Sequence, residues 1–251
     1  MQPPKTVAQI QAMREGGKIL AQIFAALRKE VQPGVSEIYL DRWVEHQIEK
    51  RGAMVTYKTP EVNFPGAICI SVNDEVVHGI PTKRFLELGD VVKFDLVITY
   101  KGMSVDSAFT MVVGEDEPKG AKKHLLKTTE RALEVGISAV KANCFTGDIG
   151  AAIEEVLKSA KCGIVRDLAG HGIGVAVHMD PDIPNYGLRG RGKMIYEGDT
   201  ICIEPMVTLG GDAVVQDDDG WTFRTKDGSL AAHMEHTVLV TRDGCEILTK
   251  L

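Results

Sequence analysis

Residues 91–113 place two carboxylates inside strands whose other residues are apolar, and this constrains the fold more than any other feature. Residues 91–100 are rich in β-branched, aromatic and aliphatic side chains, as is typical of a strand. A turn containing glycine follows at residues 100–102, and a second apolar run then continues, so we expect a hairpin. Asp95 lies in one arm and Asp106 in the other. A buried, ionised carboxylate must be paired, neutralised or bound to a metal ion.

Three residues in the second half of the chain could complete a group with these aspartates. His171 lies in the glycine-rich segment 170–174, Glu204 ends an apolar strand, and Glu235 begins another. Each feature has a simpler interpretation when it is taken singly. An aspartate in a strand more often lies at a sheet edge or bonds to backbone, and a glycine-rich segment is more often a turn with a surface histidine.

The four carboxylates would repel one another strongly if the fold brought them together, because even one like-charged neighbour raises the pKa of a carboxyl group. Two divalent cations would balance the charge. Carboxylates with one imidazole suit Mn, Fe or Co, with Zn also possible. Two such ions, roughly 3.5–4 Å apart, can activate a bridging water and polarise a carbonyl or phosphoryl oxygen.

The composition is that of an ordinary soluble protein. The chain has 251 residues, 25% of them charged, and a formal net charge of −6, which argues against nucleic acid as the main ligand. No apolar run approaches the ~20 residues of a membrane span, and the first residues lack the apolar core of a signal peptide. Five cysteines without zinc-type spacing suggest reduced thiols, so we expect a cytoplasmic protein.

The order of the expected elements repeats. The spacing of apolar residues predicts helices over 5–31, from Ser36 to about residue 50, over 118–141 and from Thr146 onward, and strands follow each pair. The second-helix starts are 110 residues apart, and Asp95 and Glu204 are 109 apart. This predicts an α+β fold whose halves, about 5–114 and 118–245, are related by a pseudo-twofold axis with the site between them.

Six short motifs, in order, resemble the type I methionine aminopeptidase family along nearly the whole chain. They are HGIP from His78, FDL at Asp95, VD at Asp106, GHGIG around His171, EPM at Glu204 and MEHT at Glu235. The resemblance implies a single catalytic domain over 1–251 with the pita-bread fold, a curved antiparallel sheet backed by two pairs of helices. It also implies a metal-dependent hydrolase that removes the N-terminal methionine from nascent polypeptides when the second residue is small.

The resemblance also implies a role for each proposed metal ligand. Asp95 would chelate one ion, and His171 would bind the other. Asp106 and Glu235 would bridge both ions. Glu204 would bind the second ion and act as general base, with water activated between the two metals attacking the first peptide bond.

The resemblance assigns His78 and His178 to the substrate, with His178 at the scissile carbonyl oxygen and His78 near the scissile nitrogen. Phe64, Cys69 and Trp221 match residues of the methionine pocket, although core packing explains the two aromatic residues equally well. This chain departs from the family pattern nearby, with Val177 in place of a common aromatic residue and with Lys58 and Glu61 at unexpected positions. These departures leave the tolerance for the second substrate residue open.

Other polar residues have simpler interpretations. We expect His46, His124 and His233 at the surface, and strand alternation predicts that His236 faces away from the site. Residues 217–220 lack the closing glutamate of a calcium loop, and a solvated turn is favoured.

Two other classes remain as alternatives. One is a related hydrolase such as a prolidase, which usually has an extra N-terminal domain. The other is a non-catalytic binding protein with the same fold, which would typically have lost ligands that are all present here. For an enzyme of the proposed family we expect a monomer that acts near the ribosome and has no membrane or nucleic-acid site. The sequence does not identify the physiological metal.

Overall fold

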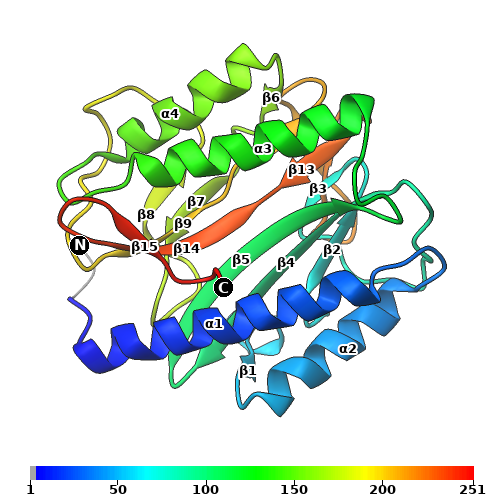
Figure 1. Ribbon diagram of the computed structural model, residues 1–251, viewed down its shortest axis with the longest axis horizontal. Coiled ribbons are helices and arrows are strands. Elements are labelled where there is room, and N and C mark those ends of the chain that lie inside the picture. Colours follow the sequence, from blue (N-terminus) through cyan, green and yellow to red (C-terminus); the bar gives the residue numbers. More distant parts are fainter. Residues whose placement is uncertain (1–3) are drawn as a thin grey trace.

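The computed structural model describes residues 4–251, which form four long helices and three antiparallel sheets (Figure 1). The helices are α1 (Val7–Glu30), α2 (Glu37–Lys50), α3 (Gly120–Ser138) and α4 (Thr146–Ser159), with a short 3-10 helix η1 (Thr56–Lys58). No helix among the described residues is both long and apolar enough to cross a membrane.

The largest sheet has nine strands in the order β1-β4-β5-β14-β9-β7-β8, with β2 added beside β4 and β15 beside β14. Its members are β1 (Met54–Val55), β2 (Cys69–Val72), β4 (Val91–Tyr100), β5 (Met103–Val112), β7 (Ala169–Gly172), β8 (Met179–Pro184), β9 (Thr200–Ile203), β14 (Glu235–Val240) and β15 (Cys245–Ile247). Every paired neighbour in it is antiparallel.

Two smaller sheets lie beside it. One has the order β13-β10-β6 and the other β11-β12-β3. Their strands are β3 (Glu75–Val77), β6 (Gly163–Ile164), β10 (Met206–Thr208), β11 (Val214–Gln216), β12 (Phe223–Thr225) and β13 (Ala231–His233).

The predicted hairpin is confirmed as β4 and β5, which pair in register from Val91 with Val112 to Tyr100 with Met103. The two residues between the strands, Lys101 and Gly102, both have positive φ, of 50° and 78°. This is the turn geometry that matches the twist of a two-residue hairpin. The long hairpin crosses the middle of the molecule and belongs to its largest sheet.

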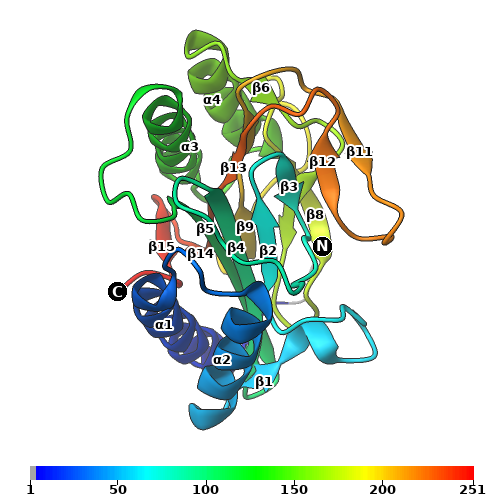
Figure 2. The same cartoon turned by 90° about the vertical axis from the view of Figure 1, so that its right-hand side faces the viewer.

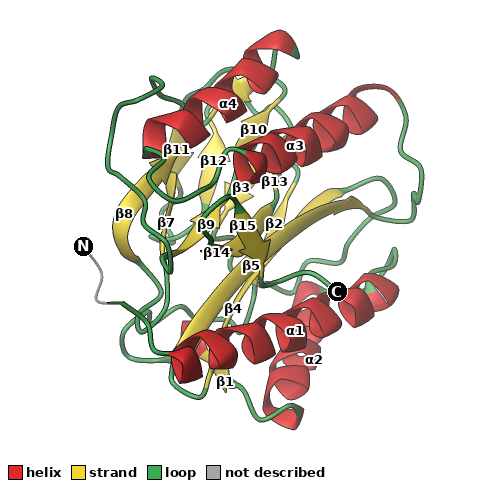
Figure 3. Cartoon of the chain, turned by 60° about the vertical axis from the view of Figure 1, so that its left-hand side comes forward, coloured by secondary structure: helices red, strands yellow, loops and turns green. Residues whose placement is uncertain are grey.

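The predicted helices form with small shifts at their ends. A capping box at Thr6 starts α1, and Ser36 caps α2 by accepting a hydrogen bond from the Tyr39 backbone N–H. The third helix begins at Gly120 rather than residue 118. Viewed from the side, the helices lie along one face of the strand layer (Figures 2 and 3), as two pairs, α1 with α2 and α3 with α4.

The internal repeat is visible in the hydrogen bonds that tie each second helix to a later loop. Isolated bridges join Ser36 to Phe85 and Phe145 to Met194, so both residue numbers increase by 109. This offset equals the expected separation of Asp95 and Glu204, whereas the expected offset of 110 between helix starts is one residue too long. The α+β fold and its internal repeat are therefore confirmed.

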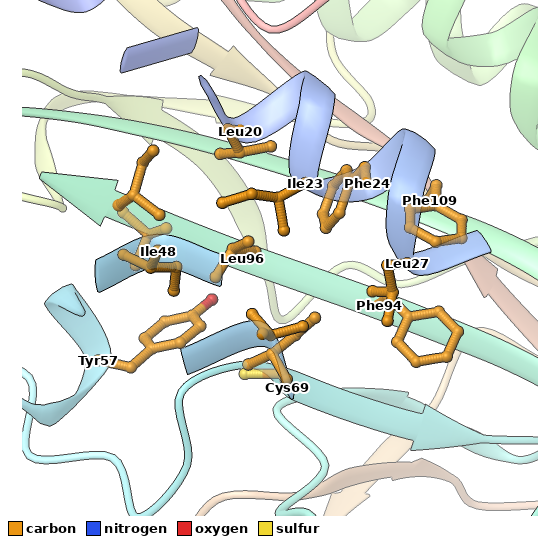
Figure 4. Close-up of a cluster of buried hydrophobic side chains, with 14 of the residues drawn as sticks. Leu20, Ile23, Phe24, Leu27, Ile48, Tyr57, Cys69, Phe94, Leu96 and Phe109 are labelled. Carbon is orange, nitrogen blue, oxygen red and sulfur yellow. The ribbon is translucent and has the colours of Figure 1, made fainter. Parts of the chain in front are cut away.

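Each half has its own large cluster of buried apolar side chains. In the first, Leu20 and Phe24 of α1 point toward the hairpin (Figure 4). The ring of Phe109 stacks on Phe94 at 5.2 Å and meets Phe24 edge-on at 4.7 Å. Burial of an aromatic or aliphatic side chain contributes about 1.5–3 kcal/mol, so these contacts hold α1 firmly against the strands that bear both aspartates.

Candidate metal centre

All ten residues that the sequence assigned to a site line one cavity of about 160 Å³. These are Phe64, Cys69, His78, Asp95, Asp106, His171, His178, Glu204, Trp221 and Glu235. A larger hollow of about 850 Å³ lies between α1 and α3, and none of the ten borders it. His236 lines that hollow while Glu235 lines the cavity, so the predicted alternation along β14 is confirmed.

Strand register explains why three of the carboxylates meet. Asp95 on β4 and Glu235 on β14 both pair with Ala108 of β5, one from each side. Asp106 precedes Ala108 by two residues, so its side chain projects from the same face of the sheet. Oxygens of Asp95, Asp106 and Glu235 lie within 4.8 Å of one another, close enough for one metal ion to contact all three.

Burial and mutual repulsion change the ionisation of these carboxylates. Burial raises the pKa of Asp95 to about 6. The pKa values of Asp106, Glu204 and Glu235 are raised well above the usual range, first by burial and then by the neighbouring carboxylates. Without a cation, this arrangement lowers the stability of the folded protein.

Two carboxylate oxygens in the cluster lack a partner among residues 4–251. Asp106 Oδ1 and Glu235 Oε1 are buried and accept no hydrogen bond from this part of the chain. Buried polar atoms without a partner are rare and require an explanation such as an ion or an ordered water. The donor set therefore fits divalent cations.

His171 is prepared to act as a neutral ligand. Its Nδ1 is 3.0 Å from the Gly172 carbonyl oxygen, and its Nε2 faces Glu204 Oε1 at 3.5 Å. The backbone contact favours a proton on Nδ1, which leaves Nε2 free for a metal. Burial lowers the pKa of the His171 imidazole to about 4. A side chain at Gly170 would collide with the Cys202 carbonyl oxygen, so glycine is required for this approach of β7 to β9.

His233 was predicted at the surface, and this prediction was wrong. Its side chain is 2% exposed and lies 3.7 Å from Glu204 and 4.0 Å from Glu235. Neither ring nitrogen has a hydrogen-bond partner in the part of the chain that the structure describes, and burial lowers its pKa to about 3. His233 precedes Glu235 by two residues, and this spacing was the sequence signal that could have placed it on the same face.

Tyr57 is a second residue that the sequence did not indicate. Its hydroxyl donates a hydrogen bond of 2.6 Å to Asp95 Oδ1, and its ring is buried. The bond orients the carboxylate and satisfies one of its oxygens. Tyr57 lies in a short 3-10 helix within an irregular segment, where no periodic pattern relates it to Asp95.

The two predicted substrate histidines flank the carboxylates. The ring of His178 lies 4.4 Å from that of His171, and the ring of His78 lies 6.0 Å from that of Phe223. Burial lowers the pKa of His78 to about 4 and also lowers that of His178. Both imidazoles are therefore neutral near pH 7, and each has one N–H to donate.

An apolar wall closes the cavity. The rings of Phe64 and Trp221 meet edge-on at 5.2 Å, and Cys69 is buried opposite Asp95 in the register of β2 with β4. The wall is completed by Val62, Val77, Leu168, Ala169, Val177 and Met206. Of the three unusual residues, only Val177 contacts the cavity. Lys58 pairs with Glu45 at 2.7 Å, and Glu61 is exposed, although its charge opposes the lowering of the His178 pKa.

Comparison with known proteins agrees with this geometry. The profile of metallopeptidase family M24 matches residues 11–242. The chain belongs to metallopeptidase family M24. Membership of this family implies a metal ion, and the buried ligand cluster is where the described residues could hold one.

Several M24 relatives cover almost the whole chain. The methionine aminopeptidase of Mycoplasma capricolum is 44% identical over 98% of this chain and 97% of its own length, and that of Clostridium acetobutylicum is 42% identical over 98% and 97%. The crystal structure of the Thermotoga maritima methionine aminopeptidase matches with a TM-score of 0.96, at 38% identity and 100% coverage of both chains. The resemblance to methionine aminopeptidases is thus confirmed.

A more distant match among the solved structures shows similarity of the fold alone. The prolidase of Pyrococcus furiosus matches with a TM-score of 0.78 at 22% identity, and the match covers 99% of this chain but 65% of the prolidase. The match thus leaves part of the prolidase without a counterpart in this chain, which agrees with the larger size expected of prolidases.

Proposed function

We propose that this protein removes the N-terminal methionine from polypeptides whose second residue is small. One observation supports the proposal most strongly: the five predicted ligands, two neutral histidines and an apolar wall all border the same small cavity. A protein that only bound a ligand in this fold would have no need to keep so costly a group of buried carboxylates.

Two divalent metal ions complete the proposed site. Asp95, Asp106, His171, Glu204 and Glu235 would hold them, and the unpartnered oxygens of Asp106 and Glu235 support this assignment. When bound, the ions would supply Lewis-acid activation of water and of the peptide carbonyl. Co, Mn, Fe and Zn are all compatible with these ligands.

The side chains of the cavity would move the proton and bind the developing charge. Glu204, whose pKa is raised by burial, would accept a proton from the attacking water and deliver it to the leaving amine. The neutral His178 would donate a hydrogen bond to the carbonyl oxygen as negative charge develops there. His78 would contact the scissile nitrogen from the opposite wall.

The apolar wall would bind the methionine side chain. Phe64 and Trp221 offer ring edges and faces to a thioether, an interaction that adds to simple burial. A cavity of about 160 Å³ is small, so a bound methionine leaves little room for a bulky neighbour. The substrates would be the N-termini of nascent polypeptides, so the protein would act near the ribosome in the cytoplasm.

The proposal is tested by the choice of substrate. Protein supplied with Mn²⁺ should release methionine from Met-Ala-Ser, and release from Met-Leu-Ser should be slower by at least about tenfold. N-acetylated Met-Ala-Ser, which lacks a free amino group, should not be cleaved. Equal cleavage of the acetylated peptide, or no cleavage of any methionine peptide with Mn²⁺, Fe²⁺ or Co²⁺, would overturn the proposal.

A further inference from the structure

An extended ion-pair network lies next to the cavity, and Glu75 is at its centre. Arg84 Nη1 and Nη2 donate to the two Glu75 oxygens at 2.9 Å each, and Arg224 Nη2 donates to Glu75 Oε1 at 2.8 Å. The backbone N–H of Val72 donates to Glu75 Oε2 at 2.6 Å. One carboxylate thus accepts four hydrogen bonds, three of them from arginines.

Each arginine also reaches a second part of the chain. Arg84 contacts Glu37, the first residue of α2, at 2.6 Å. Arg224 pairs with Asp74 at 3.2 Å and with Asp217 at 2.6 Å. The network therefore joins α2, the start of β3, the loop before β4 and the β11–β12 hairpin.

The glutamates of this network are better shielded from water than that of the exposed Arg14–Glu246 pair. The side chains of Glu37 and Glu75 are 0% and 5% exposed, whereas that of Glu246 is 40% exposed. The arginines are partly exposed, Arg84 by 36% and Arg224 by 32%. Shielded, bidentate arginine contacts are stronger and geometrically more specific than exposed pairs.

Each of the two strands that the network joins lies next in the chain to a residue that lines the cavity. Strand β3 ends at Val77, directly before His78, and β12 begins at Phe223, two residues after Trp221. Arg224 is paired with Glu75 in the register of these strands, and Phe223 with Val77 (Figure 2). The β11–β12 hairpin lies at the edge of the molecule in Figure 2, and the backbone N–H of Thr225 also ties it to the Asp74 carbonyl oxygen at 2.9 Å. The ring contact of Trp221 with Phe64 is a further restraint beside the arginine network.

We propose that Glu75 is a positioning residue of the site, which, through Arg224, holds the Trp221 wall of the methionine pocket against the strand that ends at His78. The proposal rests on the function proposed above. Glu75 contacts neither substrate nor ligands. It sets the distance between the apolar wall and the histidine.

The test compares two arginine variants in a protein with Trp43→Phe, so that Trp221 is the only tryptophan. Arg224→Met removes the link between Glu75 and β12. Arg14→Met is the matched control, because it removes a bidentate arginine–glutamate pair that joins α1 to β15, far from the cavity. For each, kcat and KM for Met-Ala-Ser, acrylamide quenching of Trp221 and the melting temperature are measured.

Arg224→Met should raise KM about tenfold and change kcat by less than about twofold. A tenfold effect is smaller than the ~100-fold loss of activity that a 1 Å displacement can cause. Quenching of Trp221 should increase. Arg224→Lys, which keeps the charge but not the forked geometry, should give an intermediate KM. Arg14→Met should lower the melting temperature with KM and quenching unchanged.

Glu75→Gln should raise KM and also lower kcat, because both Arg84 and Arg224 lose their ionic partner and β3 is released with His78. If Arg224→Met changes only the melting temperature, as Arg14→Met does, the network is merely structural and the proposal is wrong. If the parent protein releases no methionine, the proposed function fails, while unchanged Trp221 quenching in Arg224→Met would separately overturn the positioning role.

Discussion

Lys93 shows at the scale of one residue how burial controls ionisation beside the site. It lies on β4 two residues before Asp95 and is 1% exposed. Its Nζ donates to the carbonyl oxygens of Asn73 at 2.8 Å and Val91 at 3.3 Å. Burial lowers the pKa of this lysine from 10.5 to about 7, although the nearby Glu75 carboxylate opposes the shift.

This gives a prediction for the pH dependence of stability. Between pH 7 and 10.5 an unfolded chain keeps the proton on Lys93 and the native protein does not, so this group makes unfolding less favourable as pH rises. The unfolding free energy of the parent minus that of Lys93→Met should therefore rise from pH 7.5 to 9.5, by at most about 1.4 kcal/mol per pH unit. Urea denaturation at several pH values measures it. A difference that does not vary with pH would contradict the buried, neutral lysine.

Glu204 gives the corresponding prediction for catalysis. Glu204→Gln keeps the shape of the side chain but removes the proton acceptor and weakens one metal contact. Methionine release should fall by about 10²–10⁴-fold, the usual contribution of a general base. Steady-state kinetics with Met-Ala-Ser measures the loss, and circular dichroism confirms that the fold is kept. Activity within threefold of the parent would exclude Glu204 as the base.

The sequence predicted the site residues that strand patterns or family motifs identify, and it missed those positioned only by tertiary contacts. A carboxylate in an apolar strand is easy to recognise, so the sequence indicated Asp95, Glu204 and Glu235, which the structure brings to one cavity. Tyr57 could not be found, because its bond to Asp95 depends on the path of an irregular segment. His233 was misplaced because a histidine beside alanines has no obvious cost.

At the scale of elements, close packing against backbone fixes where α1 lies. Gly17 faces the C-terminal segment, and an added Cβ would overlap the Leu248 carbonyl oxygen. Its neighbour Gly16 has more room, with Tyr100 Cβ at 3.2 Å. The spacing of apolar residues predicted this helix well. It did not show which glycine packs against the backbone of the C-terminal segment, because that contact joins residues more than 200 positions apart.

Alanine at these two glycines tests the contact. Both substitutions gain about 1 kcal/mol of helix propensity, so their difference isolates the steric clash. Gly17→Ala should destabilise the protein by about 1–3 kcal/mol relative to Gly16→Ala, because the backbone must shift to admit the methyl group. Thermal and urea unfolding measure both. Equal stability of the two variants would show that the packing of α1 is looser than described.

At the scale of the whole molecule, the buried carboxylates couple metal binding to folding. The proposed ligands, on β4, β5, β7, β14 and directly after β9, line one cavity, so a bound ion would join both halves of the repeat. The repeat itself was predicted from the order of helices and strands, since each half follows the same local patterns. The exact offset of 109 needed the bridges at Ser36 and Phe145, which no local pattern reveals.

Metal ions should therefore raise the melting temperature. At a Mn²⁺ concentration 100 times Kd the native state gains about 2.7 kcal/mol, and this corresponds to roughly 5–10 °C for a chain of this size. Differential scanning calorimetry of chelator-treated protein with and without Mn²⁺ measures the shift. Glu235→Gln, which removes one buried charge and one proposed ligand, should show a smaller shift. A shift of the same size in this variant would place the metal elsewhere.

Methionine release by chelator-stripped protein, measured before and after addition of Mn²⁺ with the bound metal determined on the same samples, tests the central claim most directly. We predict no release from Met-Ala-Ser by the stripped protein. Activity should then increase together with bound metal, and His171→Ala should bind less metal and release less methionine at every concentration. Full activity in protein shown to be free of metal would contradict the account.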